Sequence, residues 1–156
     1  MKFYFKGSHK KIKGDKEGLG ICSFVIPEWG LLHRSIVFDK DLVLLDFMSL
    51  LLLFEFMTQN PSFFKEINFF TVCGPKKILQ YVNSDNKLPK KVEAFRNASN
   101  AYITKIKQDM RTPINFLEAS EKESLAFFSI DSLKVDKKLA KYLTLLSKEH
   151  NDTYKG

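Results

Sequence analysis

Cysteine is scarce in this sequence, and the chain has no disulfide framework or zinc motif. The two cysteines, Cys22 and Cys73, lie far apart and form no pair at CxxC spacing. Structural zinc sites and disulfide-rich scaffolds need several cysteines at short, regular spacings. The cysteine content therefore argues against both classes and predicts a protein of a reducing compartment, the cytoplasm.

A long uncharged hydrophobic run is also missing. The most apolar stretch, Leu42–Met57, is interrupted by Asp46 and Glu55. A membrane span needs roughly 20 mostly apolar residues. The N-terminal residues turn charged and glycine-rich before an apolar leader develops. We therefore expect a buried core helix here and no association with a membrane.

What is present is enough apolar material for one compact core. The chain has 156 residues, of which 44% are hydrophobic and 15 are phenylalanine. A chain of this length can bury about two thirds of its unfolded surface. We predict a single domain over residues 1–148, followed by a polar tail over 149–156.

The hydrophobic pattern predicts a mixed α/β fold. Short alternating or apolar runs bounded by Gly, Pro and Asp predict strands, and apolar positions at a spacing of three and four predict helices. Asp39 or Asp41 is a suitable N-cap for the central helix, and Pro61 ends it. The expected order is three antiparallel strands (2–5, 19–27, 31–38), a helix (39–60), a strand (67–73), two helices (76–82, 90–107), a strand (114–119) and a helix (135–148).

This order resembles that of the ribonuclease H-like superfamily. Local residues add to the resemblance: Lys6-Gly7-Ser8 ends the first strand, where the family has Asp-Gly-Ser, and Asp46 lies early in the central helix, where the family has a catalytic Glu. Cys73-Gly74 ends the fourth strand, where the family has an Asp, and Asp136 precedes Leu139-Ala140 as in the family's last motif. The resemblance implies a five-stranded mixed sheet with helices on both faces.

The same resemblance implies phosphodiester hydrolysis with two metal ions held by a carboxylate cluster, but two of the expected carboxylates are absent. Lys6 brings a like charge to one metal-ligand position, and the thiol of Cys73 suits Mg²⁺ poorly. Only Asp46 and Asp136 remain as candidate catalytic residues, and a Lys6–Asp46 salt bridge would replace a metal by an internal cation. We therefore expect a degenerate site without metal or cofactor.

Each of these residues also has a purely structural interpretation. Asp46 can serve as an early-helix charge that is favoured by the helix dipole, and Asp136 can serve as a helix cap. Cys73 can be a small buried hydrophobic residue.

The net charge of +7 and the pI near 9.3 are consistent with a polyanionic partner. In the family that the chain resembles, a basic helix grips the hybrid duplex. The alternative is that these basic residues only form solvated helix faces. The candidate nucleic-acid-binding residues are Lys10, Lys11, Lys13, Lys76, Lys77, Lys90, Lys91 and Arg96.

The sequence is compatible with three alternative functions. The first is a non-catalytic domain that binds duplex or hybrid nucleic acid or serves as a scaffold. The second is a Mg²⁺- or Mn²⁺-dependent nuclease that uses Asp46 and Asp136, with Asp39 or Glu55 as further carboxylates. The third is a structural domain with a protein partner.

Overall fold

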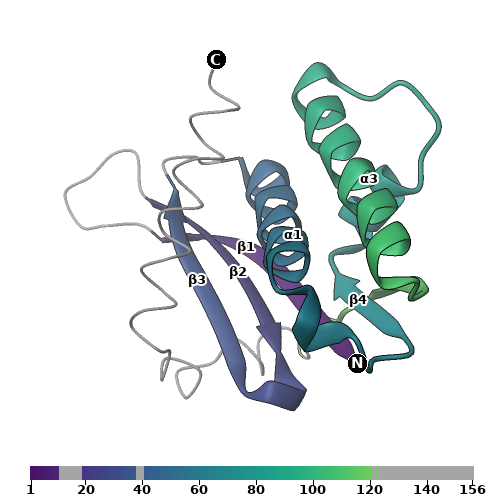
Figure 1. The fold of residues 1–156 in the computed structure, drawn as a ribbon. Helices are drawn as coiled ribbons and strands as arrows, with labels where there is room; N and C mark the ends of the chain where they lie inside the picture. Colours follow the sequence, from purple (N-terminus) through teal and green to yellow (C-terminus); the bar gives the residue numbers. More distant parts are fainter. Residues whose placement is uncertain (11–18, 38–40, 121, 123–156) are drawn as a thin grey trace.

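The chain folds around a five-stranded mixed sheet. The computed structural model describes residues 1–10, 19–37, 41–120 and 122. The strand order is β3-β2-β1-β4-β5, which places β1 at the centre (Figure 1). The strands are β1 (Lys2–Lys10), β2 (Leu19–Ile26), β3 (Leu31–Val37), β4 (Phe70–Gly74) and β5 (Ile114–Glu118).

The strand directions match the predicted topology. β1, β2 and β3 form an antiparallel meander, and β4 pairs parallel to both β1 and β5. The short 3-10 helix η1 (Pro27–Trp29) and a left-handed Gly30 turn the chain from β2 into β3. The parallel pairs are joined through helices, because a parallel connection must cross back over the sheet.

The helices are α1 (Leu42–Gln59), α2 (Lys76–Val82) and α3 (Lys90–Met110), with a 3-10 helix η2 (Pro61–Phe64) after α1. The side chain of Asp41 caps α1 by accepting from the Val43 amide at 3.0 Å. α1 and α3 pack side by side, and both begin at the upper end of the view in Figure 1.

α1 is the core helix that the sequence predicted. By length and composition it could cross a membrane, but 67% of its apolar window is buried inside the fold. It packs against β1, β2 and α3, and its apolar residues join one large cluster with those of the sheet, α2 and α3. A helix that is apolar nearly all round needs this kind of enclosure.

A second, smaller apolar cluster lies on the other face of the sheet. Residues that alternate along a strand point to opposite faces. Phe3 and Phe5 therefore join the α1 cluster, whereas Tyr4 joins Val25, Leu32 and Cys73 in the smaller one, with Ala119 packed against it. By the same alternation Lys6 shares a face with Tyr4.

Several predicted boundaries were wrong. The first strand continues past Phe5 to Lys10, because β2 pairs with β1 from Tyr4↔Val25 to Lys10↔Leu19. The fourth strand begins at Phe70 and not at Ile67, since the Ile67 amide instead bonds to the Phe64 carbonyl and closes η2. α3 continues beyond Lys107 to Met110. The predicted last helix and tail lie outside the described residues.

His33 on β3 is an unusual core residue. It is 1% exposed and packs between the rings of Phe24 and Phe56, with centroid distances of 4.6 and 5.8 Å. Within the described part of the chain neither ring nitrogen has a hydrogen-bond partner. Burial lowers the pKa of His33 from 6.5 to about 3, so His33 is neutral in the folded protein at neutral pH.

We expect the change His33→Leu to make the protein resistant to acid. The unfolded chain takes up a proton near pH 6.5, whereas the folded chain does so only near pH 3, so the free energy of unfolding falls as the pH drops through this window. The full effect approaches roughly 5 kcal/mol. Urea denaturation at several pH values measures it, with exposed His9→Asn as the control. An unchanged pH slope in His33→Leu would contradict the assignment.

Candidate functional site

The candidate site is built where the first turn and a half of α1 meets the middle of β1. The Gly7 amide of β1 donates a hydrogen bond to Oδ1 of Asp46 at 2.7 Å. The last paired residues of β1 and β4 are Tyr4 and Cys73, so the Gly7 amide lies beyond that pairing. Asp46 thus accepts from a backbone donor of β1 at a point where β4 no longer pairs with it.

Gly7 permits this approach because it has no side chain. A Cβ atom at Gly7 would lie 2.5 Å from the Leu45 carbonyl carbon and 2.7 Å from the Asp46 amide nitrogen. Any other residue would push the helix backbone away from β1. In the sequence Gly7 stands out only as part of a family pattern, and its role as amide donor and spacer was missed.

Burial controls the charge of Asp46. The residue is 8% exposed, and removal from water raises its pKa from 3.8 to about 6, while the Gly7 hydrogen bond and the nearby Lys6 ammonium oppose the rise. Desolvation disfavours the carboxylate because a low-dielectric site stabilises charge poorly. Asp46 is therefore a carboxyl group that titrates close to neutral pH.

Lys6 is close to Asp46 but is not its direct partner. Lys6 is half-buried on β1, and its charge acts on Asp46 through space. Within the described residues the two side chains form no ion pair. The salt bridge considered from the sequence is thus replaced by the hydrogen bond from Gly7.

Cys73 is placed as a packing residue. It is 1% exposed and belongs to the small cluster with Tyr4, Val25 and Leu32. A buried cysteine outside a disulfide behaves as a small hydrophobic residue. Its position at the end of β4, beside β1, matches the position expected from the sequence.

The other candidates are more widely spread. Glu55 lies further along α1, where it accepts a hydrogen bond from Gln59 at 3.3 Å. Lys10 is at the end of β1. The exposed candidates are Lys76 and Lys77 at the start of α2 and Lys90 and Lys91 at the start of α3. Asp39, Asp136, Lys11 and Lys13 lie outside the described residues.

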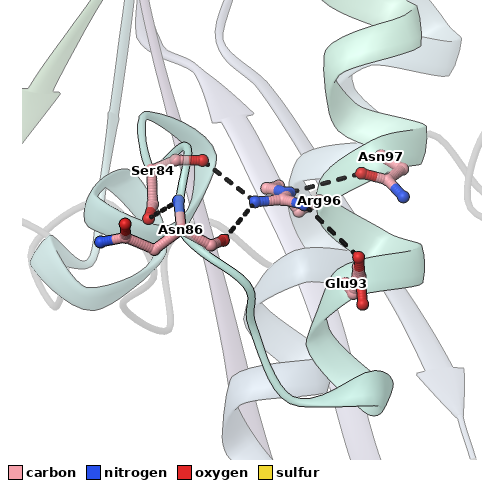
Figure 2. Close-up of polar contacts among 5 residues, drawn as sticks. All are labelled: Ser84, Asn86, Glu93, Arg96 and Asn97. Carbon is pink, nitrogen blue, oxygen red and sulfur yellow. Dashed lines mark hydrogen bonds and ion pairs between the residues drawn. The ribbon is translucent and has the colours of Figure 1, made fainter.

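Arg96 holds a loop, as Figure 2 shows. Its Nη1 donates to the carbonyl oxygens of Ser84 and Asn86, each at 3.0 Å. Nη2 lies 3.8 Å from Glu93, and the side chain is 12% exposed. The guanidinium therefore ties the segment between α2 and α3 to α3, and its predicted role in binding nucleic acid remains a prediction.

The carboxylates, thiols and imidazoles do not converge on a metal-binding arrangement in the part of the chain that the structure describes. No three His, Cys, Asp or Glu residues gather there. The chemistry available around Asp46 and Lys6 is a buried carboxyl group whose pKa is raised to about 6 and a half-buried ammonium group.

Comparisons with known proteins establish the fold. No protein family and no curated protein sequence matches the chain. Among solved structures, RNase H1 from Halobacterium salinarum matches with a TM-score of 0.56 at 8% identity over 78% of this chain and 86% of that one. The N-terminal RNase H domain of a Mycobacterium tuberculosis protein matches with a TM-score of 0.51 at 8% identity over 78% and 89%. The chain therefore has the ribonuclease H-like fold.

We expect Asp46→Asn to stabilise the protein above neutral pH. The folded state keeps its proton up to a pKa of about 6, whereas the unfolded chain releases it near 3.8. Wild type therefore loses stability as the pH rises through this window, by on the order of 2–3 kcal/mol at most. Asparagine keeps an oxygen for the Gly7 amide. Urea denaturation at pH values on both sides of the window should show that Asp46→Asn is more stable than wild type only at the higher pH. An equal gain in stability at both pH values would show that the ionisation of Asp46 is not its cause.

We expect Arg96→Lys to lower the free energy of unfolding by about 1–3 kcal/mol, because lysine keeps the charge but cannot reproduce the forked hydrogen bonds. Denaturation in urea measures the loss. Exposed Lys91→Gln is the control and should change stability by less than about 0.5 kcal/mol. Wild-type stability together with weakened nucleic-acid binding in Arg96→Lys would instead indicate a ligand-binding guanidinium.

Proposed function

We propose that this ribonuclease H-like domain binds duplex or hybrid nucleic acid without cutting it. The observation that carries the proposal is the environment of Asp46. Its carboxylate is buried and hydrogen-bonded to the Gly7 amide, with a lysine close by. A hard divalent cation needs several accessible oxygen ligands, and neither a lysine at position 6 nor a buried thiol at position 73 supplies one.

The distribution of cations supports a polyanionic ligand. The exposed pair Lys90 and Lys91 lies at the start of α3, and α3 begins at the same end of the molecule as α1 (Figure 1). Lys76 and Lys77 follow β4, whose end lies beside β1. Exposed lysines bind phosphates without reading sequence.

Two of the solved proteins that share the fold are named as an RNase H1 and an RNase H domain. Their names supply the class of ligand in the proposal, nucleic acid. They do not supply the activity, because the fold alone hosts many functions and function depends on the residues of the site.

The test is fluorescence anisotropy with a labelled RNA–DNA hybrid and a labelled DNA duplex at about 50 and 200 mM salt. We expect affinity to fall steeply with salt, and the double change Lys90→Gln with Lys91→Gln to reduce the slope of log K against log salt by about 1–2. Exposed Lys65 after η2 provides the control, and Lys65→Gln should leave the slope unchanged.

Incubation of the same substrates with Mg²⁺ or Mn²⁺ tests the catalytic half of the proposal. We expect intact strands on a denaturing gel. Cleavage that is lost in Asp46→Asn would instead establish a metal-dependent nuclease. Failure to bind either substrate at the lower salt would remove the nucleic-acid role and leave a protein-binding or structural domain.

A further inference from the structure

Two exposed aromatic rings meet at the end of the molecule where α1 ends. Trp29 lies on η1 between β2 and β3, and Phe63 lies on η2 after α1. The two rings pack edge to face with their centroids 6.3 Å apart, although Trp29 is 40% and Phe63 59% exposed. We call these two residues the aromatic pair. The connection from β2 to β3 and the end of α1 lie at the lower end of the view in Figure 1.

The backbone holds the aromatic pair in a fixed position. Each residue belongs to a short 3-10 helix that begins with a proline, and the Gly30 amide closes η1 by donating to the Pro27 carbonyl at 3.0 Å. The Trp29 ring also packs on Phe64 at a centroid distance of 5.1 Å, and Phe64 is fully buried. The exposed rings are therefore placed before a partner arrives, so that a contact with them costs little conformational entropy.

The residues around the aromatic pair resemble the anatomy of a protein interface. Tryptophan and phenylalanine are enriched at the centres of such interfaces, and the rim around them is polar. Here Glu28 adjoins Trp29, and Lys65 and Glu66 follow η2, and all three charged residues are exposed. A platform that stacks single-stranded nucleic acid instead combines its rings with a positively charged groove. The two carboxylates therefore favour a protein over a polyanion at this end.

The charges at this end suit a second copy of the same chain. The chain has a net charge of +7, so two copies repel each other and approach at least cost where carboxylates offset the cations. In a twofold contact the same surface meets itself, so its rim must supply both signs. The exposed charges at this end include Glu28, Glu66, Lys65 and the Met1 ammonium, which donates to the Phe69 carbonyl at 2.9 Å. Both signs are thus available for complementary contacts.

We propose that a second copy of this chain docks on the aromatic pair, with Trp29 of each copy against Phe63 of the other across a twofold axis. The pair exposes roughly 200 Å² of ring surface per copy, well below the roughly 800 Å² per partner of a standard interface. The dimer is therefore weak, with a Kd on the order of 10–100 µM. This inference does not depend on a role in binding nucleic acid.

A dimer of this kind leaves the proposed nucleic-acid surface free. Lys90 and Lys91 lie at the start of α3, and both α1 and α3 begin at the end of the molecule opposite to the aromatic pair (Figure 1). α1 has 18 residues, so that it separates the two ends by roughly 27 Å. Two copies joined at the aromatic pair would present these lysines away from the contact.

The first test uses the wild-type protein alone, in sedimentation equilibrium from about 2 to about 200 µM. We expect the mass to rise from the 18.1 kDa of one chain toward twice that value. Trp29 is the only tryptophan of the chain, so acrylamide quenching of its fluorescence should fall over the same range as the ring is covered. The mass of one chain at every concentration would overturn the inference, as would a dimer in which the quenching is unchanged.

The second test locates the contact with a matched pair of variants. Phe63→Glu places a charge in the proposed contact and should weaken self-association at least tenfold. The control is Leu42→Glu, because Leu42 is 49% exposed and lies at the other end of α1. It should associate within about twofold of wild type, and far-UV circular dichroism checks that both variants fold. Equal association of the two variants would overturn the inference.

The third test asks whether the contact is twofold. Trp29→Lys and Phe63→Glu should each associate weakly alone, because each removes one ring from both halves of the contact. In an equal mixture, the introduced lysine of one copy meets the introduced glutamate of the other, and the second Trp29–Phe63 contact is retained. We therefore expect the mixture to associate more strongly than either variant. A mixture that associates no better than its components would overturn the proposed arrangement.

Discussion

The contact between α1 and the middle of β1 is the constraint on which the rest of this structure depends. Gly7 lets the helix backbone come within a distance that no side chain would permit, and the Gly7 amide then binds Asp46 at 2.7 Å. The contact sets how closely the apolar helix packs against the sheet. It also places a carboxyl group beside a lysine on the central strand. Packing and site chemistry therefore share the same few atoms.

The charge states of the buried titratable groups depend on how little water reaches the two faces of the sheet. Burial raises the pKa of Asp46 and lowers that of His33, so both groups favour their neutral forms for the same reason, the cost of placing charge in an apolar interior. The accessible charges in the described part of the chain include the lysines at the starts of α2 and α3. Buried groups that favour their neutral forms and accessible lysines together suit a polyanionic ligand better than a cation.

The fold was predictable because its signals are local. Alternating strands, the apolar run of α1, the Asp41 cap and the prolines at 61, 75 and 89 mark the elements of the described chain closely. The errors in the predicted strand boundaries occurred where backbone hydrogen bonding overrides local preference. β1 extends to Lys10 because β2 supplies a partner, and Ile67 is not in a strand because its amide closes η2. The pairing of β1 with β2 joins two separate strands, so it leaves no trace in local propensity.

The sequence by itself determined the composition of the site: a lysine and a cysteine stand where a carboxylate cluster was expected, and Asp46 stands in an otherwise apolar helix. Only the tertiary structure decided how these residues are used. It directed Asp46 to the Gly7 amide and not to Lys6, turned Cys73 into the small cluster, and engaged Arg96 in a loop. The reason is physical: a side chain's partner depends on which backbone groups remain unpaired after the strands have aligned, and that alignment is a property of the whole sheet.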